Sequence, residues 1–177
     1  GRAMNLGWYR DGDIRAAVDF LAKQPDVDPT RIGAVGESMG GEEAIGAVAA
    51  ERRLRAVVAE GATGRVAGDL DWLSDVYGAR GTVQEAISTF TTSITDLLTD
   101  ASAPITLREA VEQADAHVLL ITAGTQADER HAARRIRASA PERARIWTVP
   151  GAGHTGGLRP RPAEWERRVT AFLDEQL

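Results

Sequence analysis

Short apolar runs and longer amphipathic segments alternate along the chain. Four short runs, each ending near a glycine, are typical of strands buried in a parallel sheet: Arg31 to Gly36, Arg55 to Glu60, His117 to Ala123 and Arg145 to Val149. Between and around them, apolar positions recur at helical spacing, which predicts helices from about Asp13 to Lys23, directly after Ser38, and over Leu70 to Val76, Val83 to Leu98, Leu107 to Ala114, Glu129 to Ala138 and Ala163 to Gln176. This alternation predicts an α/β fold, a parallel sheet with helices on both faces.

The 177 residues suit a single domain, 1–177, without internal repeats. Residues 61–114 interrupt the alternation, because they hold several helical patterns and no strand. Long connections in compact domains are often functional. We therefore expect 61–114 to form a helical lid that shapes a substrate pocket; the alternative is a plain helical crossover packed on the sheet.

Composition narrows the function classes. A net charge of -5, with no dense block of lysine or arginine, disfavours a nucleic-acid partner. The longest apolar runs are of strand length, so no membrane span is expected in this segment. There is no cysteine, which excludes disulfides, thiolate metal sites and a cysteine nucleophile. No histidine–carboxylate cluster has metal-ligand spacing and no phosphate-binding glycine motif is present, so neither a metal nor a cofactor is expected.

The sequence Gly36-Glu37-Ser38-Met39-Gly40 is the strongest motif in the chain. It is a G-x-S-x-G pattern between a predicted strand and a predicted helix, the context of a nucleophile elbow. The flanking glycines allow the two backbones to pass closely, and the turn lifts the serine hydroxyl clear of the sheet. Ser38 is therefore the candidate nucleophile. The backbone N–H of Met39, next to it, is the candidate oxyanion-hole donor.

A serine nucleophile needs a histidine base and an orienting acid. His154 lies in a glycine-rich loop directly after the last predicted strand, where a base is expected, whereas His117 and His131 have no such position. In the loop after the third strand, Asp128 is the candidate acid because it is expected to precede a helix; it could instead cap that helix. Glu129 is the first substitute.

Together these segments resemble the α/β-hydrolase superfamily, and most of all its dienelactone-hydrolase-like and prolyl-oligopeptidase-like esterases and acyl-peptidases. The stretches that carry the resemblance are Ala16 to Leu21, Asp26 to Gly33, Gly36 to Gly41 and Gly151 to Thr155. The resemblance implies a serine hydrolase that cleaves a small carboxylic ester or an amide through an acyl-enzyme. Ser38 would be the nucleophile, Asp128 the acid and His154 the base. A noncatalytic hydrolase-fold binding module and an acyltransferase are the alternatives.

The chain matches only the carboxyl-terminal half of that fold. The early strands of the family, which carry the loop with the second oxyanion donor, have no counterpart here. The strand from Arg31 to Gly36 would normally be central in the sheet, and if it were left as an open edge it would promote association with other strands. We therefore expect the amino-terminal half to exist elsewhere, in the same gene product or as a separate chain, and to be the partner of this segment.

Overall fold

Four parallel strands form the centre of the protein. The computed structural model describes Trp8 and residues 12–101 and 103–177. The strands β1 (Ile32–Glu37), β2 (Leu54–Glu60), β3 (His117–Ala123) and β4 (Ala144–Val149) pair in the order β1-β2-β3-β4. All four predicted strands are present within one residue of the expected bounds, and the predicted α/β class is confirmed.

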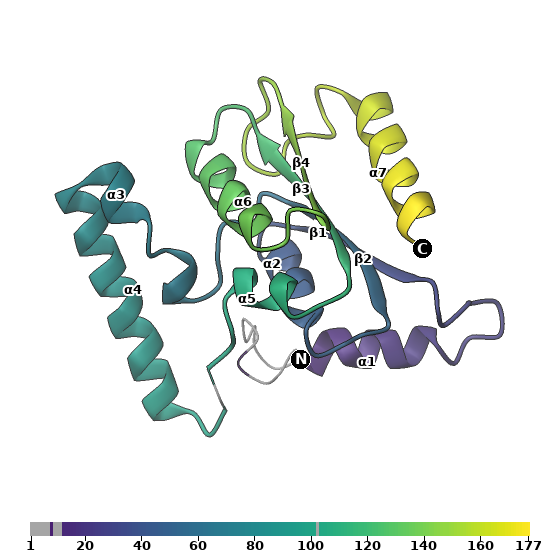
Figure 1. The fold of residues 1–177 in the computed structure, drawn as a ribbon, viewed down its shortest axis with the longest axis horizontal. Helices are drawn as coiled ribbons and strands as arrows, with labels where there is room; N and C mark the ends of the chain where they lie inside the picture. Colours follow the sequence, from purple (N-terminus) through teal and green to yellow (C-terminus); the bar gives the residue numbers. More distant parts are fainter. Residues whose placement is uncertain (1–7, 9–11, 102) are drawn as a thin grey trace.

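The helices between the strands also follow the predicted alternation (Figure 1). Their bounds are α1 Gly12–Leu21, α2 Met39–Ala47, the 3₁₀ turn η1 Ala67–Asp69, α3 Leu73–Tyr77, α4 Ala79–Leu98, α5 Leu107–Glu112, α6 Ala127–Ser139 and α7 Pro162–Gln176. One bound matters for the site: α6 begins two residues earlier than expected, so its first turn includes residues that were predicted to lie in the preceding loop.

Side chains of the strands alternate between two apolar layers because successive residues of a strand point to opposite faces. Val57 and Leu120 pack in the layer covered by α2, α5 and α6, with Val18 of α1. Val58 and Ile121 pack in the layer covered by α7, through Val169 and Phe172 of that helix. The sheet is thus covered on both faces, as Figure 1 shows.

Strand β1 lies at one edge of the sheet. In the described part of the chain it pairs with β2 alone. Val35 of β1 is 52% exposed, whereas Val58, its partner in the register with β2, is fully buried. An apolar, parallel edge strand with exposed side chains is unusual, because such edges promote pairing with further strands.

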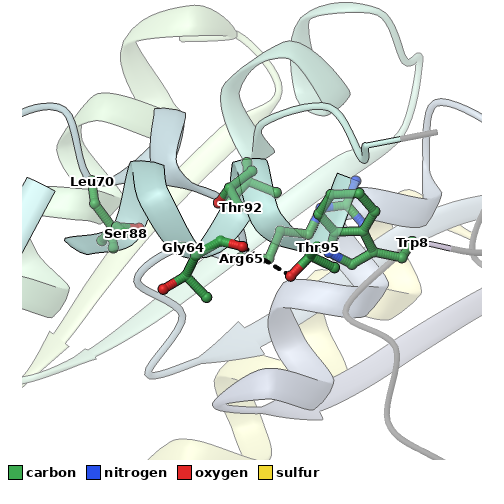
Figure 2. Close-up of a pocket in the computed structure, with 9 residues that line it drawn as sticks. Trp8, Gly64, Arg65, Leu70, Ser88, Thr92 and Thr95 are labelled. Carbon is green, nitrogen blue, oxygen red and sulfur yellow. Dashed lines mark hydrogen bonds between the residues drawn. The ribbon is translucent and has the colours of Figure 1, made fainter. Parts of the chain in front are cut away.

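The segment between β2 and β3 consists of η1, α3, α4 and α5. Helix α5 belongs to the core, with Leu107 and Val111 fully buried. Helix α4 lies outside, on the far left in Figure 1. A pocket of about 290 Å³ lies between α4 and the loop after β2; Ser88, Thr92 and Thr95 of α4 line it opposite Gly64 and Arg65 (Figure 2). None of the described helices has the length and apolar character needed to cross a membrane.

Candidate active site

Ser38 occupies a strained turn between β1 and α2. Its φ is 50°, in the left-handed region that non-glycine residues seldom adopt. Two backbone hydrogen bonds fix the turn: the Ser38 N–H donates to the Glu60 carbonyl (2.7 Å), and the Ser38 carbonyl accepts from the N–H of Glu42 (3.0 Å). Strain of this kind persists only where the surrounding structure imposes it, and it is concentrated at functional sites.

Glycine is required at position 36 for this turn. A Cβ there would lie 2.5 Å from the carbonyl group of Gly40, a distance that side chains do not tolerate. A Cβ at position 40 would meet nothing within 4 Å. Of the two glycines in the motif, the first is therefore the one that sterics demand.

His154 reaches Ser38 from the loop after β4. Its Nε2 lies 3.0 Å from the Ser38 Oγ, although the two residues are 116 positions apart. The imidazole is about half exposed, and one side of it packs against Gly61, where a Cβ would come within 3.0 Å of the ring. Thr155, the next residue, has a φ of 50°; it and Ser38 are the two non-glycine residues with positive φ in the described part of the chain.

The other side of the imidazole is held by Glu129. The Glu129 Oε1 lies 2.7 Å from the His154 Nδ1, and the Oε2 accepts a hydrogen bond from the Ala123 N–H at 2.7 Å. The glutamate is 2% exposed. An ionised carboxylate can only accept hydrogen bonds, so Nδ1 must carry the ring proton and Nε2 is left to accept one from the serine hydroxyl.

Asp128, the residue expected to orient the histidine, lies elsewhere. Its exposed carboxylate accepts a hydrogen bond from the hydroxyl of Tyr77 in α3, and this raises the pKa of Tyr77. The reason is the earlier start of α6. Because Asp128 and Glu129 are both in its first turn, their side chains point about 100° apart around the helix, and Glu129, the substitute, is the one directed inward.

Two further features were not anticipated from the sequence. Glu60, at the end of β2, is 3% exposed and accepts hydrogen bonds from the Gly157 N–H (2.6 Å) and the Trp165 Nε1 (2.8 Å). It therefore ties the loop that carries His154 to the sheet and to α7. The only signal for it in the sequence is a carboxylate closing a strand that is otherwise apolar.

The loops after β3 and β4 are also joined to each other. The Thr125 Oγ1 donates to the Ala152 carbonyl at 2.8 Å, and the Gly124 N–H donates to the Val149 carbonyl at 2.8 Å. Since Glu129 follows one loop and His154 lies in the other, these bonds fix the distance between carboxylate and imidazole. All three side chains therefore meet at the carboxyl edge of the sheet, where α/β folds bind their ligands.

This arrangement is a hydrogen-bonded chain of hydroxyl, imidazole and buried carboxylate. The N–H of Met39 lies in the first turn of α2, where N–H groups have no acceptor within the helix. In the described residues no group of three or more histidine, aspartate or glutamate side chains could hold a metal ion.

Solved structures similar to this chain share its fold. An esterase from Pyrococcus furiosus is 22% identical with a TM-score of 0.63; the match covers 99% of this chain and 65% of the esterase. A dienelactone hydrolase from Anabaena variabilis is 18% identical with a TM-score of 0.63, covering 94% of this chain and 59% of the hydrolase. A puromycin-hydrolyzing peptidase from Mycobacterium tuberculosis is 14% identical with a TM-score of 0.67, covering 94% of this chain and 25% of the peptidase.

The chain thus spans about two thirds or less of the length of these three proteins. A comparison with curated proteins gave no significant match. The sequence profile of the prolyl oligopeptidase family, in contrast, matches residues 4–177. With nearly the whole length matched and the α/β-hydrolase fold in place, the chain belongs to the prolyl oligopeptidase family of serine hydrolases.

Proposed function

We propose that the chain carries the catalytic residues of a serine hydrolase that cleaves a carboxylic ester or an amide through an acyl-enzyme. The observation that supports this most is the chain of contacts from Ser38 through His154 to Glu129, at 3.0 and 2.7 Å. A weak nucleophile, a base within hydrogen-bond reach and an orienting carboxylate are what acyl transfer to serine requires.

In the proposed reaction, Ser38 attacks the substrate carbonyl while the Nε2 of His154 accepts its proton. Glu129 keeps the proton on Nδ1 and stabilises the imidazolium that forms. His154 then protonates the leaving group, which departs with the electrons of the broken bond. A water molecule then attacks the acyl-enzyme while His154 takes its proton. The bond between the acyl carbon and the Ser38 Oγ breaks, His154 returns the proton to that oxygen, and the acid is released.

The N–H of Met39 is proposed as one oxyanion donor, because it is the residue after the nucleophile and lies at the positive end of α2. A second donor is proposed to come from strands that pair with the open edge of β1. The exposed, apolar side of that edge and the greater length of the similar structures support this partner. If the chain hydrolyses a p-nitrophenyl ester as fast alone as with such strands supplied, in the same polypeptide or as a separate chain, this part of the proposal is refuted.

We further propose that residues 61–114, apart from the core helix α5, act as the lid of the site. The support is that α3 contacts α6, the helix that carries Glu129. Trp72, just before α3, stacks on His131 of α6 with ring centroids 4.3 Å apart, and Tyr77 bonds Asp128 in the turn that holds Glu129. A movement of α3 would therefore displace Asp128, the residue next to the Glu129 carboxylate.

Labelling by a fluorophosphonate probe tests the proposed nucleophile. Such probes react with activated serines, so the native protein should be labelled and Ser38→Ala should not. Loss of the nucleophile from a triad typically lowers turnover by about a million-fold. Ser93→Ala, an exposed serine on α4, is the matched control and should label like the native protein. Equal labelling of Ser38→Ala would refute the assignment, and no labelling of native protein would favour a noncatalytic module.

A further inference from the structure

Helix α4 directs its apolar face to solvent and its polar face to the body of the protein. Its exposed large apolar side chains are Val83, Ile87, Phe90, Ile94, Leu97 and Leu98, with exposed fractions of 60, 61, 68, 39, 79 and 77%. The positions that face the body of the protein, and are half-buried, are polar: Glu85, Ser88, Thr92, Thr95 and Thr99. Surface helices ordinarily direct the apolar face inward.

The polar face has a hydrogen bond to the rest of the protein and one within the helix, whereas the buried hydroxyl of Thr99, directly after α4, has no partner among the described residues. The Glu85 carboxylate accepts a hydrogen bond from the Ser74 N–H (2.7 Å) at the start of α3, and the Thr95 hydroxyl donates to the Thr91 carbonyl (2.9 Å). Ser88, Thr92 and Thr95 face the pocket shown in Figure 2. The apolar side chains are thus directed to solvent, while the polar face of α4 lies toward the body of the protein.

The exposed apolar side chains of α4, Val83 to Leu98, are called the stripe here, and they are spaced as in a coiled coil. From Val83 to Leu97 the steps are four, three, four and three residues, which keeps the stripe on one side of the helix and repeats every seven residues. This pattern matches a partner that is itself a helix with the same repeat, and a second α4 supplies that repeat.

The charge around the stripe and the area that it exposes also favour a second copy of this chain as its partner. The residues that flank the stripe, Gln84, Ala86, Thr91 and Ser93, are uncharged, so two copies can approach without like-charge repulsion. A membrane-surface helix would instead be rich in lysine and arginine, and the only cation of α4 is Arg80.

Taking about 120 Å² for an aliphatic and about 200 Å² for an aromatic side chain, the stripe exposes roughly 500 Å² per copy. A symmetric pair would bury at most about 1,000 Å², which is the lower limit for a specific interface.

We propose that α4 is a homodimer interface, in which the stripe from Val83 to Leu98 packs against the same stripe of a second chain about a two-fold axis. This interaction is separate from the proposed hydrolase chemistry and does not depend on it. It also accounts for the reversed helix, because in the dimer the apolar face is buried and the polar face lines each protomer's own pocket.

Light scattering coupled to size exclusion tests the dimer. The native chain should have twice the 18.9 kDa of one copy. Phe90→Glu, which places two carboxylates in the centre of the interface, should weaken association by at least about 100-fold and give the monomer mass. Thr89→Glu adds the same charge to an exposed position off the stripe and should leave the dimer intact.

Cross-linking gives a second measurement, since the chain has no cysteine of its own. Phe90→Cys lies near the middle of α4 and should form an interchain disulfide on oxidation, whereas Thr89→Cys should not. A monomeric native chain at about 100 μM would overturn the proposal. A dimer that Phe90→Glu leaves intact would also overturn it by assigning association to another face, such as the β1 edge. So would a monomer that binds phosphatidylglycerol vesicles through the stripe.

Discussion

The adjacent carboxylates Asp128 and Glu129 provide the sharpest test of the site, because only one of them contacts the imidazole. In Glu129→Gln one oxygen is replaced by an NH₂ group. The carboxylate it replaces accepts from two donors, the His154 Nδ1 and the Ala123 N–H, both at 2.7 Å. The glutamine can accept from one of them and must present a donor to the other.

If the glutamine oxygen stays on Ala123, its NH₂ group faces the His154 Nδ1. Nδ1 must then accept, so the ring proton moves to Nε2, the nitrogen that lies 3.0 Å from the Ser38 Oγ. A protonated Nε2 cannot take the serine proton. The wrong tautomer in a triad lowers turnover by about 10⁴, which corresponds to about 5.4 kcal/mol of lost transition-state stabilisation. We expect a loss of that order in kcat/KM.

The assay is the hydrolysis of a p-nitrophenyl ester, with circular dichroism to establish that each variant is folded. Asp128→Asn is the matched control: its exposed side chain keeps an oxygen for the Tyr77 hydroxyl, so kcat/KM should change by no more than about twofold, the effect of a surface substitution. The reasoning fails if Glu129→Gln keeps activity within tenfold of the native protein, or if Asp128→Asn is the more damaging change.

Three further predictions concern the framework around the site. Gly36→Ala should lower the urea midpoint sharply or abolish soluble expression, because its Cβ would lie 2.5 Å from the Gly40 carbonyl. Gly40→Ala, with open space around its Cβ, should be neutral or stabilising. Equal effects of the two changes would contradict the steric argument. Glu60→Gln should cost about 1–3 kcal/mol of unfolding free energy, since the amide can accept only one of the two N–H donors that the buried carboxylate binds; an unchanged denaturation curve would exclude its role in holding the loop. Burial first, and neighbouring arginines second, lower the pKa of His131 below its ordinary 6.5. The unfolded state therefore binds the proton more readily than the folded state. The free energy of unfolding should keep the whole contribution of a neutral His131 above pH 6.5 and should decrease as the pH falls through the folded-state pKa. His131→Phe, which keeps a ring against Trp72, should lose less stability between about pH 8 and about pH 5 in urea titrations, and an identical loss would refute this origin.

The strand and helix pattern was predictable because it depends on local periodicity. Each strand was expected within one residue of its bounds, since a buried parallel strand is a continuous apolar run that ends where a glycine turn begins. The positions of Ser38 and His154 followed from the same logic: both come directly after strands that point the same way. Chain order alone therefore placed them at one edge of the sheet.

The choice between Asp128 and Glu129 depended on where α6 begins. Local propensity does not fix a helix end to a single residue, and one residue changes the direction of a side chain by about 100°. Within α6, Glu129 lies on the buried face with Ala132, Ala133 and Ile136, whereas Asp128 is exposed and accepts a hydrogen bond from Tyr77. Glu60 was missed for a related reason, because its two partners are separated from it by about a hundred residues.

By itself, then, the sequence determined the alternation of strands and helices, the strained serine turn and the histidine loop, because each follows from local periodicity, glycine sterics and chain order. Tertiary structure alone decided which carboxylate meets the histidine and which face of α4 is turned to solvent. Amphipathic spacing shows that a helix has an apolar face, but the direction of that face depends on what the rest of the fold packs against it.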